Sequence, residues 1–148
     1  MKDTSIDQSL KLFVVMSKSY RAVNDLINKK IQSYGLNPTE FAVLELLYHK
    51  GDQPLQQIGE KILLASGSIT YVVDKLEKKQ LLERVSCAKD RRVIYAHISE
   101  QGVAMMNEIF PKHAEYIDEC FSIFSEEEKL QTIDLLKKLG YAQVEHKE

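Results

Sequence analysis

The sequence predicts a mainly α (α+β) fold in which helices from both chain ends flank a small central unit. Two observations lead to this prediction. Apolar residues recur every three or four positions through residues 4–33 and 100–139, which is the period of an amphipathic helix. Between these stretches, residues 55–98 favour a helix, a turn, a second helix and then two short alternating strands joined by a charged tip. The central unit therefore has the order of a helix-turn-helix followed by a hairpin.

The first predicted helix covers residues 4–33, where neither glycine nor proline interrupts the helical period. A helix of this length extends over roughly 40 Å or more at 1.5 Å per residue, which is longer than a domain of this size needs internally. A long amphipathic helix at a chain end indicates a partner, most simply a second copy of the chain. Its apolar positions include Leu10, Phe13, Val14, Met16, Tyr20, Val23, Leu26, Ile27 and Ile31.

The next helix is expected to begin at Asn37-Pro38-Thr39-Glu40, after Gly35 ends the first. Asn37 is a favourable N-cap, Pro38 suits the first helical position, and Glu40 can complete a capping box. Gly51-Asp52 should end this helix, and a third short helix is expected from Leu55 to about Leu64.

The second helix of the helix-turn-helix is predicted over residues 66–79, with Ser66 as its cap. Short hydroxyl side chains and free N–H groups at a helix N-terminus suit base edges and phosphates, so this end of the helix is a candidate for reading DNA. An ordinary amphipathic helix with a solvated polar face explains the same pattern. Gln80 follows the helix, and a left-handed conformation there would cost about 1 kcal/mol. We therefore expect the helix to end in another way.

Strands are predicted over residues 81–85 and 93–98, and Lys89-Asp90-Arg91-Arg92 lies at the tip between them. An arginine carried by a narrow ribbon can enter the minor groove of DNA, where the negative potential is concentrated. Asp90 can hold one arginine in a fixed pose through a bidentate pair. A solvated turn is the alternative explanation of this charge cluster.

After the hairpin, a long helix is expected over residues 100–124. Ser125-Glu126-Glu127-Glu128 is a capping box for a final helix, and Gly140 is its expected C-cap.

Composition limits the possible classes of function. The net charge is −2, but residues 1–51 and 52–98 each carry +2 and residues 99–148 carry −6. Since screening limits phosphate contacts to the local field, the acidic third does not exclude DNA binding. No apolar run is long enough for a membrane span, and the N-terminus lacks the apolar core of a signal peptide. We expect a cytoplasmic protein.

No enzymatic, cofactor or metal signature stands out, and the four histidines are scattered. The two cysteines form no disulfide framework. Cys87 lies at the base of the hairpin tip, where neighbouring cations favour a reactive thiolate, whereas Cys120 falls on an apolar stripe. Whether either cysteine senses oxidants stays open.

The order and spacing of these segments resemble the MarR family of winged-helix transcription regulators over nearly the whole chain. The residues that carry the resemblance are 35–44, 68–77, 81–84, 90–92 and 98–102. Within residues 63–72, the pattern looks most like the branch of the family that answers to quinones and other aromatic electrophiles. The sequence departs from the family at Gln80, where glycine is frequent, and at Ala65, where a hydroxyl cap is usual.

The resemblance implies a homodimeric repressor that binds a pseudo-palindromic, inverted-repeat operator in double-stranded DNA and is released by a small phenolic or quinone effector or an oxidant. It implies a winged helix-turn-helix domain at residues 36–99 and a helical dimerisation region at residues 1–35 and 100–148. The predicted DNA-binding residues are Ser66, Ser68, Thr70, Tyr71, Lys75, Lys89, Asp90, Arg91 and Arg92.

In the family the effector crevice lies between the dimerisation helices and the winged unit. Phe13, Tyr20, Tyr48 and Phe110 are plausible lining for it, although aromatic residues on apolar stripes are more often core. A winged helix used only for docking to proteins is the alternative function, and an enzyme is a more distant one.

Overall fold

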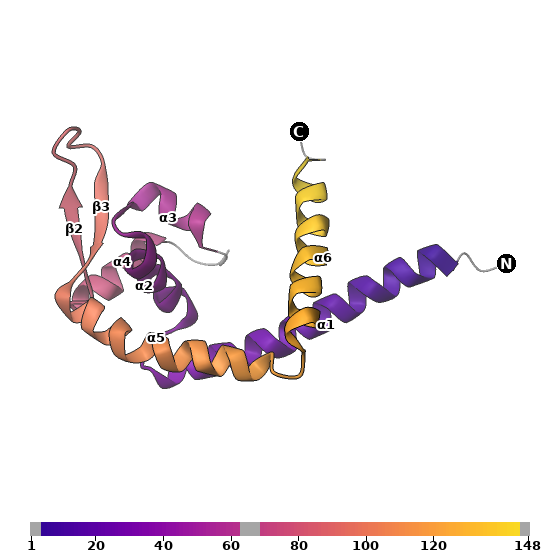
Figure 1. Ribbon diagram of the computed structural model, residues 1–148. Helices are drawn as coiled ribbons and strands as arrows, with labels where there is room; N and C mark the ends of the chain where they lie inside the picture. The colour runs from indigo at the N-terminus through magenta and orange to yellow at the C-terminus, as the bar shows by residue number, and fades with distance from the viewer. Residues whose placement is uncertain (1–3, 63–68, 146–148) are drawn as a thin grey trace. The chain divides into compact units, whose positions relative to one another are not determined.

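The computed structural model describes residues 4–62 and 69–145 (Figure 1). The chain forms two compact units, residues 1–113 and 114–148. The first unit contains α1 (Thr4–Ser33), α2 (Pro38–Lys50), α3 (Leu55–Lys61), α4 (Ile69–Lys78) and most of α5 (Glu100–Cys120). The second contains the end of α5 and all of α6 (Glu126–Glu145). The predicted mainly α fold is confirmed.

The start of α2 follows the predicted capping box. Asn37 Oδ1 accepts a hydrogen bond from the backbone N–H of Glu40 at 2.8 Å, and Glu40 Oε1 accepts one from the N–H of Asn37 at 3.0 Å. Pro38 occupies the first turn, where its missing N–H costs no hydrogen bond. The helix ends at Lys50, and Gly51 adopts a φ of 80°.

A three-stranded antiparallel sheet lies against the helices of the first unit, in the order β1–β3–β2. β2 (Leu82–Ser86) pairs with β3 (Ile94–Ile98), with Arg84 opposite Ala96. β1 (Gln53–Pro54) pairs with the other edge of β3 and was not predicted from the sequence. A strand of two residues has no alternation to detect, and its proline is tolerated because the strand lies at the sheet edge.

The core of the first unit is formed by α2, α3, α4, β3 and α5. Val43, Leu44, Ile58, Val73 and Met106 are fully buried in it. α2 contributes more buried apolar residues to this core than any other helix. This packing holds α4 and the β2–β3 ribbon on one rigid support.

Ser99 and Gly102 fix the point where α5 leaves the sheet. Ser99 accepts a hydrogen bond from the N–H of Gly102 through its Oγ at 3.0 Å and donates its hydroxyl to the carbonyl of Gln80 at 2.7 Å. A Cβ at residue 102 would lie 2.2 Å from the carbonyl oxygen of Leu81. Glycine is required there because the helix and the chain after α4 meet backbone to backbone.

In the second unit, the predicted capping box of α6 is confirmed. Ser125 Oγ accepts from the N–H of Glu128 at 3.1 Å, and Glu128 Oε1 accepts from the N–H of Ser125 at 3.0 Å. The expectation that Gly140 ends this helix was wrong, because α6 continues to Glu145. Tyr141 and the residues after it are compatible with a helix, and a single internal glycine costs only about 1 kcal/mol.

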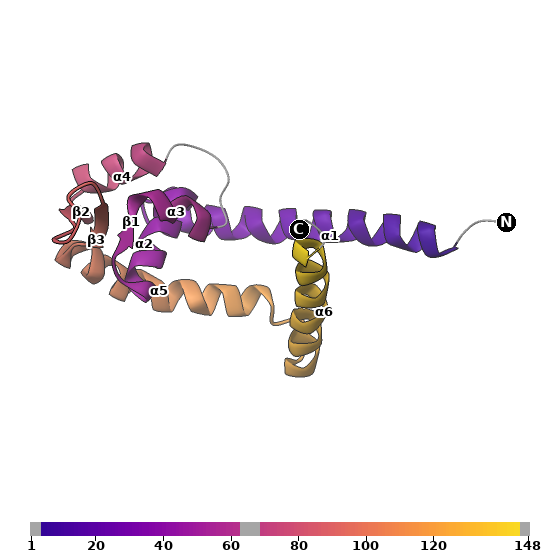
Figure 2. The ribbon, with the colours of Figure 1, turned by 90° about the horizontal axis from the view of Figure 1, so that it is seen from above.

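The N-terminal part of α1 projects from the first unit as one unbroken helix, while its C-terminal end packs on α2 (Figure 2). Leu10, Phe13 and Tyr20 on this projecting part are all more than 60% exposed. Over the described residues, no helix combines the length and the apolar character that crossing a bilayer requires.

Candidate nucleic-acid interface

The two faces of α4 separate apolar anchors from exposed polar groups, as predicted. Val72, Val73 and Leu76 are buried against the core. Thr70 and Tyr71 are exposed, Tyr71 to 60% of its surface. Lys75 Nζ lies 5.1 Å from the centroid of the Tyr71 ring, a cation–π distance that gives both side chains a preferred pose. This part of α4 therefore carries a hydroxyl, a phenol and an ammonium group outside the core.

Two predicted contacts, Ser66 and Ser68, lie outside the described residues. Ser66 was also the expected cap of the helix.

The C-terminal end of α4 departs from the expectation. Gln80 has a φ of 64°, so it does adopt the left-handed conformation. The N–H of Leu81 donates to the carbonyl of Leu76 at 2.9 Å, and the N–H of Gln80 donates to the carbonyl of Glu77 at 2.9 Å, which is a Schellman motif. These bonds, together with the Ser99 hydroxyl on the Gln80 carbonyl, offset the strain of a residue that has a Cβ.

The ribbon of β2 and β3 with its tip, residues 82–98, is called the wing below (Figure 1). At its tip, Asp90 accepts three hydrogen bonds from Arg92, from the backbone N–H at 3.0 Å, from Nε at 3.2 Å and from an Nη at 3.4 Å. The Arg92 side-chain hydrogen bonds, followed by its backbone hydrogen bond, hold the pKa of Asp90 below its usual value.

The Arg92 side chain is nevertheless 91% exposed. Lys89 and Arg91 are exposed beside it. Asp90 therefore braces Arg92 in a fixed pose, as the sequence predicted, and leaves its outer surface free for a phosphate or a groove.

Arg84, which the sequence analysis did not assign to the site, joins the wing to α4. Its guanidinium lies 2.5 Å from Asp74 and 2.7 Å from Glu77, and its side chain is 25% exposed. The hydrogen bond to Asp74 raises the pKa of Arg84, and the charge of Glu77 adds to the effect. The two acids are one helical turn apart on the same face of α4. This spacing was the sequence signal that could have indicated a shared basic partner. Arg84 thus links α4 to the wing and pairs with two carboxylates on the helix surface.

A cavity of about 380 Å³ opens in the first unit. Phe13, Tyr20, Tyr48 and Phe110 do not line it; Tyr48 instead donates its hydroxyl to Asn107 Oδ1 at 2.5 Å. The lining comes from α1, α2, residues 61–62 and His113. It comprises Asn24, Ile27, Asn28, Ile31, Pro38, Phe41, Ala42, Glu45, Leu46, His49, Lys50, Lys61, Ile62 and His113.

His113 is the most notable polar group of this cavity. It is 4% exposed, its ring centroid lies 4.5 Å from that of Phe41, and its Nδ1 has no hydrogen-bond partner among the described residues. Burial lowers the pKa of His113, so its imidazole is neutral at pH 7. Burial also raises the pKa of Glu45, an effect that the charge of His49 partly opposes. Neutral His113 is thus a polar group without a hydrogen-bond partner among the described residues in the lining of this cavity.

Both cysteines are free thiols and half-buried. Within the described part of the chain, no group of three or more histidine, cysteine or acidic residues is arranged to hold a metal ion.

Comparison with known proteins places these features in context. The model of the MarR family matches residues 36–94. The HTH-type transcriptional regulator MhqR of Bacillus subtilis is 63% identical over 134 residues, which cover 90% of this chain and 92% of the relative. The uncharacterized HTH-type transcriptional regulator YkoM of the same organism is 43% identical, with 93% and 90% covered.

Solved structures of MarR family regulators have a similar fold. AbsC, a MarR family transcriptional regulator from Streptomyces coelicolor, superposes with a TM-score of 0.83 at 18% identity, and the match covers 97% of this chain and 96% of that chain. At this low identity the likeness concerns the fold alone.

Proposed function

This chain belongs to the MarR family, and from that premise we propose that it is a sequence-specific DNA-binding repressor that acts as a homodimer on an inverted-repeat operator. The observation that carries the proposal is the braced Arg92 at the wing tip, held on the same support as the exposed face of α4. Two separate contact surfaces on one rigid unit suit the two grooves of a duplex.

In this proposal α4 enters the major groove. Thr70, Tyr71 and Lys75 face base edges or phosphates, together with Ser66 and Ser68, which precede the helix in the sequence. Tyr71 offers a ring to thymine methyl groups and a hydroxyl to polar edges, while Lys75 supplies a positive charge. Lys89, Arg91 and Arg92 of the wing reach the flanking minor groove, where negative potential is highest.

The homodimer is supported by the apolar side chains left exposed on the projecting part of α1 and in residues 114–145. Phe13 and Leu10 are examples in α1, and Leu135 and Leu136, both more than 50% exposed, are examples in α6. Large apolar side chains left exposed in this way mark a protein interface. Residues 1–35 and 100–148 would form the dimerisation region, and residues 36–99 would bind DNA.

A small aromatic effector, a phenol or a quinone, is proposed to occupy the cavity beside His113. Its volume suits one ring with small substituents. Neutral His113 can accept a hydrogen bond from a phenolic hydroxyl through its open Nδ1, and the Phe41 ring offers a stacking surface. An effector that binds only the form of the dimer with the wrong spacing would release the operator. Oxidation of Cys87 is the alternative trigger.

A repressor of this kind works where the chromosome is, so a cytoplasmic location is part of the proposal, and no enzymatic turnover is required of it.

The experiment is enrichment of random-core DNA duplexes by the purified protein at near-physiological salt, under reducing conditions. Recovery of an inverted repeat with half-sites about 10 bp apart is expected. The recovered site then serves to test phenols, quinones and oxidants for release. A folded, dimeric protein that enriches no sequence would contradict operator binding and favour a module that docks on proteins.

A further inference from the structure

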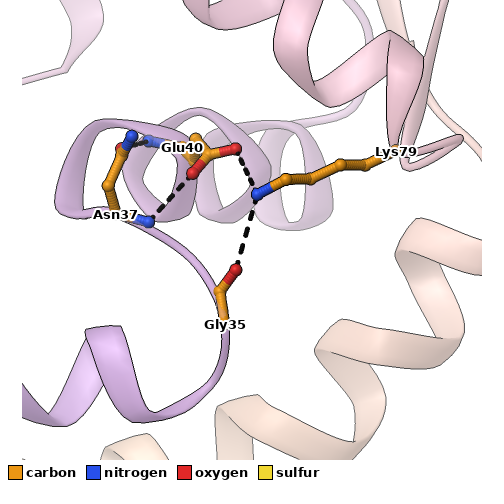
Figure 3. A network of polar contacts seen from close by, with 4 residues as sticks. All are labelled: Gly35, Asn37, Glu40 and Lys79. Carbon is orange, nitrogen blue, oxygen red and sulfur yellow. Dashed lines mark hydrogen bonds and ion pairs between the residues drawn. The ribbon is translucent and has the colours of Figure 1, made fainter.

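Three helix ends meet at one ammonium group, that of Lys79 (Figure 3). Lys79 directly follows the last residue of α4. Its Nζ donates to Glu40 Oε2 at 2.8 Å, in the first turn of α2, and to the carbonyl of Gly35 at 3.4 Å, just beyond the end of α1. The contacts span 39 and 44 residues of sequence, so they fix tertiary structure and not a local turn.

Glu40 is an unusual partner because its side chain is only 3% exposed. One of its oxygens is occupied by the capping bond from Asn37, and the other accepts from Lys79. A buried carboxylate that loses its counter-charge is strongly destabilised, so the pair resists separation. The Lys79 side chain is 42% exposed, so a substitution of Lys79 disturbs less buried structure than a substitution of Glu40.

The Gly35 contact ties Lys79 to α1. Gly35 adopts a φ of 86° and its N–H donates to the carbonyl of Gln32, which closes the last turn of the helix. The carbonyl groups at a helix C-terminus carry partial negative charge and favour a cation. Apolar packing, such as that of Val73 and Leu76 of α4, is non-directional and tolerates small rotations, whereas these polar contacts specify a direction.

We propose that Lys79 is a positioning residue that sets the orientation of α4 relative to α1, and so sets the half-site spacing that the dimer accepts. The inference rests on the proposed homodimer, in which α1 belongs to the dimerisation region. Arg84 fixes α4 to the wing, and Lys79 fixes the opposite side of α4 to the helix that joins the two protomers.

Half-site spacing is a sensitive readout of such a link. Each base pair added between half-sites turns one of them by about 35° and moves it by about 3.4 Å. A rigid dimer cannot follow this displacement, whereas a dimer with loosely attached recognition helices follows part of it. General destabilisation of the fold lowers the affinity for every spacing alike and leaves the ratio of affinities unchanged.

The experiment uses the inverted repeat enriched by the wild-type protein and two derivatives with one base pair added or removed at its centre. Dissociation constants are measured for wild type, Lys79→Met, Lys79→Arg and Lys78→Met. Lys78→Met removes the same charge one residue earlier, at an exposed side chain, and is the matched control. Unfolding midpoints of all four proteins are measured in parallel.

We expect wild type to bind the altered spacings at least about tenfold more weakly than the original, as a rigid dimer must. Lys79→Met should reduce the ratio of the dissociation constants for the altered and original spacings at least threefold. This is on the order of half of the wild-type ratio on a logarithmic scale. Lys79→Arg, which keeps a cationic donor, should retain most of the discrimination. Lys78→Met should weaken all three sites equally.

An unchanged spacing ratio in Lys79→Met, with wild type discriminating normally, would overturn the inference. Wild type that binds all three spacings equally would instead contradict the proposed fixed dimer. Should Lys79→Met not fold, Glu40→Gln provides the same test, because it keeps the capping hydrogen bond and removes the charge that holds Lys79. A folded Glu40→Gln with the wild-type ratio would also overturn the inference.

Discussion

The core of the first unit and the helices of residues 114–145 treat the same kinds of apolar residue in opposite ways. Val43, Leu44 and Val73 are completely buried in the first. In the second, none of the described side chains of residues 114–144 is buried, and Leu130 and Leu135 are more than 60% exposed. The first region buries its apolar side chains within one chain. The second leaves the apolar side chains of its helices exposed, as expected of a surface that contacts a partner. In the proposed function, DNA reading and assembly therefore belong to regions with different sources of stability.

The largest expected effect comes from a charge placed in the exposed apolar region. Leu136→Glu should weaken dimerisation by at least about 2 kcal/mol, a factor of roughly 30, because an unpaired carboxylate would be buried in the dimer. Sedimentation equilibrium measures the effect, and Gln143→Glu on the same helix is the matched control. A variant that remains as dimeric as wild type would remove α6 from the interface and weaken the comparison.

The packed region should respond most to Gly102→Ala. The added Cβ would lie 2.2 Å from the Leu81 carbonyl oxygen and 2.7 Å from an Ile98 side-chain carbon, and backbone must move to admit it. We expect the free energy of unfolding to fall by about 2 kcal/mol, in the middle of the range of overpacking effects. Urea denaturation followed by circular dichroism measures it. A loss below 1 kcal/mol would show that the junction of α5 with the sheet is less tight than described.

A smaller effect is expected from pH, through buried His113. Because burial lowers its pKa in the folded state, the unfolded chain binds more protons below the ordinary value of 6.5. Stability contributed by neutral His113 is present above that pH and is lost as pH falls below it. Urea midpoints of wild type should therefore decrease from pH 7.5 to 5.5, and those of His113→Leu should decrease less. Parallel profiles for the two proteins would contradict the assignment.

The smallest effect is expected at Gly140, the counterpart of Gly102 in the second unit. A Cβ there meets nothing within 4 Å, and the residue lies inside α6. Gly140→Ala should stabilise the helix by about 0.5–1 kcal/mol, because it reduces the entropy lost on folding. A higher thermal midpoint is the expected observation. Destabilisation would indicate that position 140 faces a closely packed surface in the dimer.

Features written in neighbouring residues were predicted from the sequence. The capping boxes at Asn37 and Ser125 are such features, and so is the brace between Asp90 and Arg92, because their partners are two or three residues apart.

Features that depend on distant chain segments were not predicted. The link from Lys79 to Glu40 and Gly35 joins residues with no local pattern in common. Gln80 was expected to avoid the left-handed conformation because of its strain. The hydrogen bond from Ser99, 19 residues away, helps to offset that strain and has no local signal in the sequence. β1 is too short to show alternation. Glycine is common at helix ends, but Gly140 lies inside α6.

The most direct test of the central claim compares wild type and Arg92→Ala on the enriched inverted repeat over a range of salt concentrations, by fluorescence anisotropy. Arg92 is exposed at the wing tip, so its removal leaves the fold intact. We expect Arg92→Ala to bind more weakly by more than about 1 kcal/mol and to show a shallower salt dependence, since phosphate or groove contacts of that cation are lost. Equal affinity and an equal salt slope for the two proteins would contradict the role of the wing in DNA binding.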